Sequence, residues 1–434
     1  MPIKYRRTVL PNGLTVVSER IPYTRSVAAG FWIARGSRDE SARDNGITHL
    51  IEHLSFKGTA TRSARDIALS MESIGGHLDA FTTKEETCFY ARALDEHLPR
   101  AVDIIADIVC RPRFSPRDLS RERKVVLEEI KSLEDAPDDQ IHDHFDQVIF
   151  DGHPLARPII GTAATCRSFT REGIMAYRAR HFGPGDTVVA VAGNVDHKRL
   201  VALLAGLCPG RCGARRTDKA LRPPRIAGGL TVVRRDIAQV HLCLGFPAIP
   251  YTHPDRYALM LLSTMLGGGM SSRLFQAIRE EAALAYAVNS YLELYRDTGV
   301  FGVYLGTSPA RIQQAADMVL AEIRKVAAGP VPAAEFASAQ AQLKGNMILG
   351  MESITNRMMR MAKTELIGEP HRDVGHTIRT TPSGWWRRCG ARTWPGWRGR
   401  CARRAGCRPP CWGRSSGTAS RCTARSWRRS PPAS

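Results

Sequence analysis

Two histidines and a glutamate lie close together in residues 48–54 (THLIEHL). On a helix, residues four apart project from the same face one turn apart, so His49 and His53 can bind the same metal ion. Glu52 lies on that side, three residues after His49. Imidazole nitrogen is a typical ligand of Zn²⁺, and a free carboxylate beside the metal can accept a proton from water. This order is the reverse of the commoner His-Glu-x-x-His motif and predicts hydrolytic metal chemistry.

A hydrolytic zinc site needs a third protein ligand and an open position for water. Residues 120–130 (SRERKVVLEEI) have a helical pattern and contain three glutamates. Glu122 and Glu129 are seven residues apart, or two turns, and therefore share one face of this helix, whereas Glu128 lies one residue off that face. The pattern alone leaves both Glu122 and Glu129 open as the third ligand.

The net charge of +20 is concentrated at one end of the 434-residue chain. Residues 381–434 contain 13 Arg but no Lys, Asp or Glu, which leaves a net charge of +7 for residues 1–380. The same tail contains no Val, Ile, Leu, Met, Phe or Tyr, so it predicts neither helix nor strand. We interpret it as out-of-frame or disordered sequence, in preference to an Arg/Trp-rich tail that binds RNA, and we expect no nucleic-acid partner.

The remaining composition is that of a globular protein in a reducing compartment. No apolar stretch approaches the roughly 18 residues that a membrane span needs. The first 17 residues (MPIKYRRTVLPNGLTVV) lack the continuous apolar segment of a secretory signal. The 11 cysteines are scattered and match no short disulfide framework. We therefore expect a cytoplasmic protein that does not contact the membrane.

The chain consists of two similar halves. Residues 12–17 (NGLTVV) recur 216 residues later as 228–233 (GGLTVV), and the same offset joins two starts of long helical patterns, Ser115 and Val331. Both halves mix strand-like apolar runs with helical periodicity, as in 187–192 and 98–109. This predicts an α+β protein with two homologous α/β sandwich domains, each an antiparallel sheet flanked by helices.

Three segments together resemble the insulinase/pitrilysin family of zinc metallopeptidases. They are 49–59 (HLIEHLSFKGT), 75–91 (GGHLDAFTTKEETCFYA) and 121–131 (RERKVVLEEIK), and the resemblance covers roughly residues 5–380. Among its members, the chain looks most like the bacterial type that is similar to mitochondrial processing peptidase. The resemblance implies one Zn²⁺ per chain with His49, His53 and Glu129 as ligands. It also implies Glu52 as the catalytic base and Glu122 as a residue that supports the ligands.

Residues 266–288 (LGGGMSSRLFQAIREEAALAYAV) resemble the C-terminal motif of the same family. The resemblance implies that Arg279 and Tyr286 contact the substrate and stabilise the reacting carbonyl. The motif departs from the family at Ala283, where a glycine is usual. At the 216-residue offset Glu122 corresponds to Ser338 and Glu129 to Gly345, so we expect no second metal site.

The alternating pattern around Asp79, Ala80, Phe81 and Thr82 is typical of an edge strand. The resemblance implies that this strand binds substrate by pairing with its backbone, as in β-augmentation.

We therefore expect four parts. They are a catalytic zinc-binding domain (1–208), a Gly/Pro/Arg-rich linker (209–229), a homologous domain without metal that is truncated (230–380), and the tail (381–434).

The predicted function is that of a zinc-dependent metalloendopeptidase that hydrolyses extended or unfolded peptides inside a closed chamber. In the family four such domains form the chamber, so a two-domain chain implies a homodimer or a related partner subunit. The alternative is a non-catalytic core subunit of a processing-peptidase-like complex. That alternative predicts broken ligands, whereas the expected ligands and Glu52 are all present here.

Overall fold

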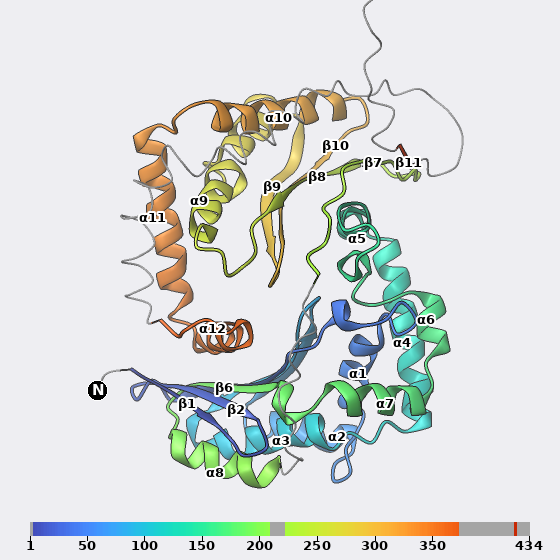
Figure 1. The fold of residues 1–434 in the computed structure, drawn as a ribbon, viewed down its shortest axis with the longest axis vertical. Coiled ribbons are helices and arrows are strands. Elements are labelled where there is room, and N and C mark those ends of the chain that lie inside the picture. Colours follow the sequence, from blue (N-terminus) through green and yellow to red (C-terminus); the bar gives the residue numbers. More distant parts are fainter. Residues whose placement is uncertain (1–2, 209–221, 373–420, 423–434) are drawn as a thin grey trace, which may run out of the picture. The chain divides into compact units, whose positions relative to one another are not determined.

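The computed structural model describes residues 3–208, 222–372 and 421–422, which form two compact units (Figure 1). Unit 1 contains the described residues of 1–135, 157–221 and 348–371, and unit 2 contains those of 136–156, 222–347 and 372–434. Except for 421–422, the predicted tail lies outside the described residues, as does most of the predicted linker. No helix in the described part of the chain is long and apolar enough to cross a membrane.

Unit 1 is built on a six-stranded sheet of order β1-β2-β6-β3-β5-β4. β2 and β6 are parallel, and all other neighbouring pairs are antiparallel. The strands are β1 Lys4–Val9, β2 Thr15–Arg20, β3 Ser26–Ile33, β4 His77–Thr82, β5 Thr87–Leu94 and β6 Thr187–Gly193. β6 is buried along its whole length, as the apolar run at 187–192 predicts for a strand covered on both faces.

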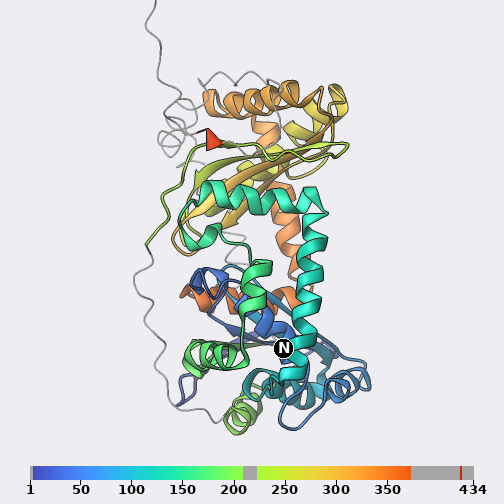
Figure 2. The ribbon, with the colours of Figure 1, turned by 90° about the vertical axis from the view of Figure 1, so that its right-hand side faces the viewer.

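Helices cover both faces of this sheet (Figure 1 and Figure 2). α3 and α8 pack on one face, and α12 packs on the other, where Met358 and Met361 contact the cluster around Trp32. The helices of unit 1 are α1 Ile47–Ser55, α2 Ala64–Glu72, α3 Leu98–Cys110, α4 Pro116–Glu134, α6 Ala163–Ser168, α7 Arg171–His181, α8 His197–Leu207 and α12 Ile354–Ile367. Short 3₁₀ turns are η1 Ser37–Asp39, η2 Asp95–His97 and η4 Pro184–Asp186.

Unit 2 has a three-stranded antiparallel sheet of order β8-β10-β9. Its elements are α5 Pro137–Ile149, η3 Pro154–Ala156, β7 Leu230–Thr231, β8 Val240–Ala248, α9 Arg256–Gly267, the π-helix η5 Phe275–Glu281, β9 Ala285–Leu294, β10 Gly299–Thr307, α10 Ile312–Ala328, α11 Ala333–Gly350 and β11 Arg421–Cys422. Side chains of α9, η5 and α10 form the main core with the sheet. β7 pairs with β11. The predicted α+β fold of two domains, with sheets flanked by helices, is confirmed. The sheet of unit 1 is mixed and not purely antiparallel as predicted, because β2 and β6 run parallel.

The sequence repeat is visible as repeated architecture. The order β3-β5-β4 in unit 1 is matched by β8-β10-β9 in unit 2. The 216-residue offset places α4 on 332–350, which is almost the range of α11, and places α5 on 353–365, almost that of α12. α5 nevertheless belongs to unit 2 and α12 to unit 1, so each unit includes one helix from the other half of the sequence.

The two sheets differ at one edge. β3 lies between β6 and β5, whereas β8 pairs, among the described residues, with β10 alone. All nine residues of β8 are half-exposed, whereas the interior of β3 is buried. At the repeat offset the counterpart of β6 is 403–409, outside the described residues. The truncation of the second domain stays a prediction.

Candidate metal centre

The helix that carries the His-x-x-Glu-His motif is α1, and it begins directly after Gly46. Gly46 has φ +92°, a backbone conformation that favours glycine. A Cβ atom there would lie 2.5 Å from the carbonyl oxygen of Ile160. Glycine at this position therefore allows both the turn into α1 and the close approach of the neighbouring segment.

The buried carboxylate of Glu40 caps α1. It accepts hydrogen bonds from Gly46 N at 2.8 Å, Thr48 N at 2.9 Å and Asn45 Nδ2 at 3.1 Å. The first amides of a helix have no partner within the helix, and a negative charge near them is favourable. Burial raises the pKa of Glu40 to about 7, while the three N–H donors act to lower it. Glu40 thus fixes the start of the helix that carries His49.

α1 is held in place by packing against α4 and α7. Its inward residues are almost completely buried, and they are Ile47, Leu50, Ile51 and Leu54. They belong to one core cluster with Val126 and Ile130 of α4 and with Tyr177 of α7. This packing leaves the histidines of α1 on the side of the helix that meets Glu122 and Glu129 of α4.

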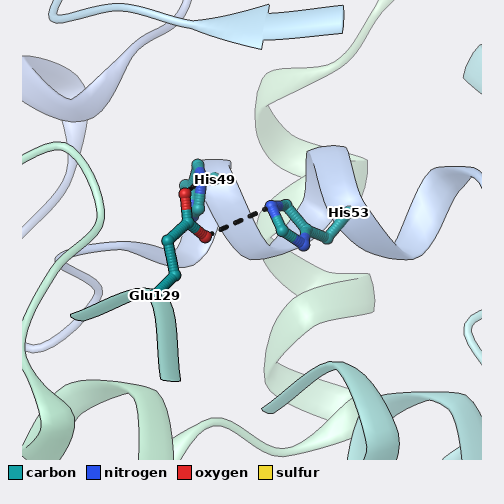
Figure 3. A group of neighbouring side chains, drawn as sticks. All are labelled: His49, His53 and Glu129. Carbon is teal, nitrogen blue, oxygen red and sulfur yellow. Dashed lines mark ion pairs between the residues drawn. The ribbon is translucent and has the colours of Figure 1, made fainter. Parts of the chain in front are cut away.

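The structure brings His49, His53 and Glu129 together (Figure 3). His49 Nε2 lies 3.8 Å from Glu129 Oε1, and His53 Nε2 lies 3.7 Å from Glu129 Oε2. One potential ligand atom from each of the three residues lies within 4.8 Å of the others. Within the described ranges, no other group of three or more His, Cys, Asp or Glu residues reaches this spacing.

The three residues fit a zinc ion in chemistry as well as in position. Glu129 Oε2 is buried and accepts no hydrogen bond, so it is available to a cation. Burial and the neighbouring His53 lower the pKa of His49 to about 4, which keeps its imidazole in the neutral form that binds metals. Two nitrogens and one carboxylate oxygen are an ordinary catalytic zinc set, bonded at about 2.0–2.2 Å.

Glu122 lies behind His53 and not in the three-residue group. Its Oε2 is 3.5 Å from His53 Nδ1, and its Oε1 is 3.0 Å from Lys57 Nζ. The side chain of Glu122 is only 6% exposed, and Lys57 is the cation that compensates its charge. A carboxylate on Nδ1 keeps the proton there and leaves Nε2 free to bind a metal.

Glu52 is the third polar residue of the motif, and its carboxylate contacts β4. Its Oε2 accepts a hydrogen bond from Thr82 Oγ1 at 2.5 Å. Burial, together with the charges of Glu129 and Asp79, raises the pKa of Glu52 to about 7, and the bond from Thr82 opposes this rise. A carboxyl group with a pKa near 7 can both accept and donate a proton at neutral pH.

The expected substrate strand is β4, which forms one edge of the six-stranded sheet, as its alternation predicted. Asp79 is exposed and accepts a hydrogen bond from Tyr90 Oη at 3.0 Å. Ala80, Phe81 and Thr82 are half-exposed. Of these residues, Thr82 is the one that is bonded to Glu52.

Arg279 and Tyr286 lie in unit 2, whereas the histidines lie in unit 1. The guanidinium carbon of Arg279 is 4.7 Å from the centroid of the Tyr286 ring, and Tyr286 is 77% exposed. Between them Ala283 has φ +48°, in the left-handed region that favours the glycine usual in the family motif. The structure thus brings Arg279 and Tyr286 together with each other.

Three contacts of this site were not predicted from the sequence. Glu40 lies in the loop before α1, and its contact with the helix start has no sequence pattern. Lys57 belongs to the motif, but nothing in the sequence pairs it with Glu122. Thr82 is expected to contact substrate, and its bond to Glu52 joins residues 30 positions apart. The sequence does show an acidic residue seven positions before Ile47, but a helix cap that comes from a preceding loop has no fixed spacing, so this position could not be recognised as a cap.

Comparison with known proteins places this arrangement in a family. The family model described as insulinase (peptidase family M16) matches residues 15–163. The model described as the peptidase M16 inactive domain matches residues 168–343. The chain is 43% identical over 378 residues to an uncharacterized zinc protease of Mycobacterium tuberculosis, covering 86% of each. It is 38% identical over 373 residues to the uncharacterized zinc protease YmxG of Bacillus subtilis, covering 86% of this chain and 91% of YmxG.

Solved structures show the same fold at lower identity. A protease from Helicobacter pylori has a TM-score of 0.79 and 23% identity, covering 88% of this chain and 96% of that one. A peptidase M16 inactive domain from Pseudomonas fluorescens has a TM-score of 0.77 and 19% identity, covering 87% and 92%. Fold and site thus define a zinc metallopeptidase class. The chain belongs to the insulinase family, peptidase family M16, as its sequence motifs predicted.

Replacing each glutamate of α4 separately tests their roles. We expect Glu129→Gln to lower zinc affinity most, because it removes the negative charge from the candidate ligand group. Glu122→Gln should lower it by about 10–100-fold, as changes behind a ligand do. Glu128→Gln is the matched control, since Glu128 is 72% exposed on the same helix. Zinc titration against a chromophoric chelator measures all three, and a larger loss in Glu122→Gln would mean that the two roles are exchanged.

Glu40→Gln tests the cap on α1. An amide has one acceptor oxygen, so part of the three-donor network is left without a partner. We expect a loss of about 1–3 kcal/mol in the free energy of unfolding and weaker zinc binding. Urea unfolding in the presence of EDTA measures the first and chelator competition the second, again with Glu128→Gln as the control. An unchanged unfolding midpoint would show that Glu40 does not stabilise α1.

Proposed function

We propose that this chain is a zinc-dependent metalloendopeptidase that cleaves extended or unfolded peptides. The observation that carries the proposal is the grouping of His49, His53 and Glu129 beside a fourth residue, Glu52, whose carboxylate is not part of the ligand group. A structural zinc site has four protein ligands, whereas a catalytic zinc site has three and leaves the fourth position open.

The two histidines and Glu129 would bind one zinc ion per chain. When bound, Zn²⁺ supplies Lewis-acid chemistry that polarises the scissile carbonyl and makes a nearby water more acidic. Glu122, 3.5 Å from His53 Nδ1, would hold the imidazole proton on that nitrogen, and Lys57 compensates the buried charge of Glu122. These residues therefore orient the ligand set.

Glu52 is the proposed general base. It takes a proton from the water that attacks the carbonyl carbon and returns it to the nitrogen of the leaving amine. Its raised pKa suits both steps near neutral pH, because the carboxylate is basic enough to accept the proton and acidic enough to release it. The hydroxyl of Thr82 fixes one oxygen of Glu52 and leaves the other free for water.

The substrate is proposed to pair with β4 as an added strand. β4 is an edge strand, so one row of its backbone N–H and C=O groups has no strand partner among the described residues. Backbone pairing of this kind selects extended chains over folded ones. Asp79, Ala80 and Phe81 would contact the substrate side chains, and Thr82 would join this strand to Glu52.

Arg279 and Tyr286 are proposed to complete the site from the second half of the sequence by contacting the substrate and stabilising the oxyanion. The exposed ring of Tyr286 and the neighbouring guanidinium of Arg279 support this role. A closed chamber assembled from two copies of the chain, or from one copy and a related subunit, belongs to the same proposal. A cytoplasmic location stays a prediction.

A non-catalytic partner subunit is the second candidate. It is favoured by the match of residues 168–343 to a domain described as inactive. The first half argues against it, since the three ligand residues and Glu52 are all retained. The two candidates differ in whether this chain hydrolyses peptides by itself or only when another subunit is added.

Glu52→Gln separates catalysis from metal binding. An amide cannot accept a proton, so we expect zinc content to stay as in the wild type while cleavage of a quenched-fluorescent peptide library falls by at least about 10²-fold. Glu128→Gln should retain both zinc and activity. Normal turnover in Glu52→Gln would rule out Glu52 as the base, and an inactive wild-type chain with full zinc content would favour the partner-subunit candidate.

A further inference from the structure

Two cysteines of unit 1, at the ends of α3 and α8, lie in contact. Cys110 is the last residue of α3, and Cys208 follows the last residue of α8. Their Sγ atoms are 3.6 Å apart although they are 98 residues apart in the chain. Both helices pack on the same face of the sheet, where Cys208 is buried and Cys110 is half-buried. An oxidant can therefore reach Cys110 more easily than Cys208.

The surroundings of Cys110 favour its thiolate form. Arg178 donates hydrogen bonds to Val109 O at 2.6 Å and to Cys110 O at 2.9 Å, which brings a positive charge to the end of α3. The hydrogen bond shared with Cys208 lowers the pKa of Cys110, and the charges of Arg178 and Arg111 lower it further against the effect of burial. The same shared bond and burial raise the pKa of Cys208. Thiolate is the reactive form of cysteine.

We propose that Cys110 and Cys208 are an oxidative modification site, which hydroperoxides convert to a reversible disulfide between α3 and α8. The Cys110 thiolate attacks one oxygen of the peroxide, the O–O bond breaks, and the departing hydroxide or alkoxide takes a proton from solvent to become water or an alcohol. Cys110 is then a sulfenic acid. Cys208 loses its proton and attacks the Cys110 sulfur, the S–S bond forms, and the S–O bond breaks to release water. Two thiols lose two electrons, and the peroxide gains them.

The geometry of the pair suits this reaction. A disulfide needs the sulfurs at about 2.05 Å, so they must approach by little more than 1.5 Å. Asn12 Nδ2 donates a hydrogen bond to Cys208 O at 2.6 Å and holds the end of α8 in place. Cys88, Cys166 and Cys243 are also free thiols, and among the described side chains Cys110 and Cys208 form the one hydrogen-bonded thiol pair.

The consequence is a fold whose stability depends on the redox state. The bond would close a loop of about 100 residues in the unfolded chain, and loops of that size give large stabilisation. We expect the melting temperature of the oxidised protein to exceed that of the reduced protein by roughly 5–10 °C, and dithiothreitol to reverse the difference. In a reducing compartment such a bond would form only under oxidative stress.

The test uses the full chain, reduced and then treated with equimolar hydrogen peroxide. Free thiols are blocked by alkylation, and the peptides are mapped by mass spectrometry without reduction. We expect a peptide pair that joins Cys110 to Cys208 in the wild type and in the matched control Cys166→Ser. Cys208→Ser should leave Cys110 as a sulfenic acid that dimedone traps. Cys110→Ser should show no cross-link.

A second control addresses Cys212, which is four residues from Cys208 and lies outside the described residues. Cys212→Ser should retain the cross-link and the rise in melting temperature. The proposal is overturned if the folded wild type shows no Cys110–Cys208 pair, or if Cys208 pairs with Cys212 instead. The wild-type peptide map decides the question even if a serine variant fails to fold, and none of these results depends on peptidase activity.

Discussion

The packing of α1 on α4 is the contact on which the metal site depends. Two ligand candidates come from α1 and the third from α4, so a shift of one helix along the other would separate Glu129 from both imidazoles. The apolar cluster that includes Leu50, Leu54 and Val126 prevents such a shift, because these side chains are buried almost completely. Glu40 fixes the start of α1, and Ser115 caps the start of α4. The apolar contact therefore sets the geometry, and the polar contacts keep its ends in place.

The polar contacts around the candidate ligands also depend on this packing of α1 on α4. Glu122 is buried on His53, and Lys57 from the turn after α1 compensates its charge. Glu52 is held from the other side by Thr82 of the edge strand. The site thus joins the two helices to β4, the proposed place of substrate binding. Changes in any of the three elements would shift the proposed zinc ligands or the proposed base.

The second half of the sequence keeps the architecture of the first without its chemistry. The order β8-β10-β9 repeats β3-β5-β4, and α11 and α12 correspond to α4 and α5, yet Ser338 and Gly345 stand where the carboxylates of α4 would be. One helix of each half belongs to the other half's unit. A truncated second half would therefore still supply α12, which covers one face of the sheet in unit 1. This arrangement makes the stability of unit 1 depend on residues beyond 350.

Much of this could be predicted from the sequence, because helical spacing alone places His49, Glu52 and His53 on one side of a helix. Spacing does not decide between Glu122 and Glu129, because both lie on the same face of α4. Which of them lies beside both imidazoles depends on where along α4 the helix α1 packs, so only the family resemblance pointed to Glu129. The exchange of α5 and α12 has no local signal, because an amphipathic helix does not indicate which sheet it covers. The same holds for the contact between Cys110 and Cys208, which joins residues 98 positions apart.

The central claim is that α1 and α4 together hold one zinc ion, and metal analysis of the purified chain tests it most directly. After dialysis against a weak chelator, mass spectrometry should find about one zinc per chain in the wild type. The account predicts that His53→Ala loses this zinc while His142→Ala, a histidine outside the group, retains it. Wild-type protein that is folded but binds no zinc, or zinc that remains in His53→Ala, would contradict it.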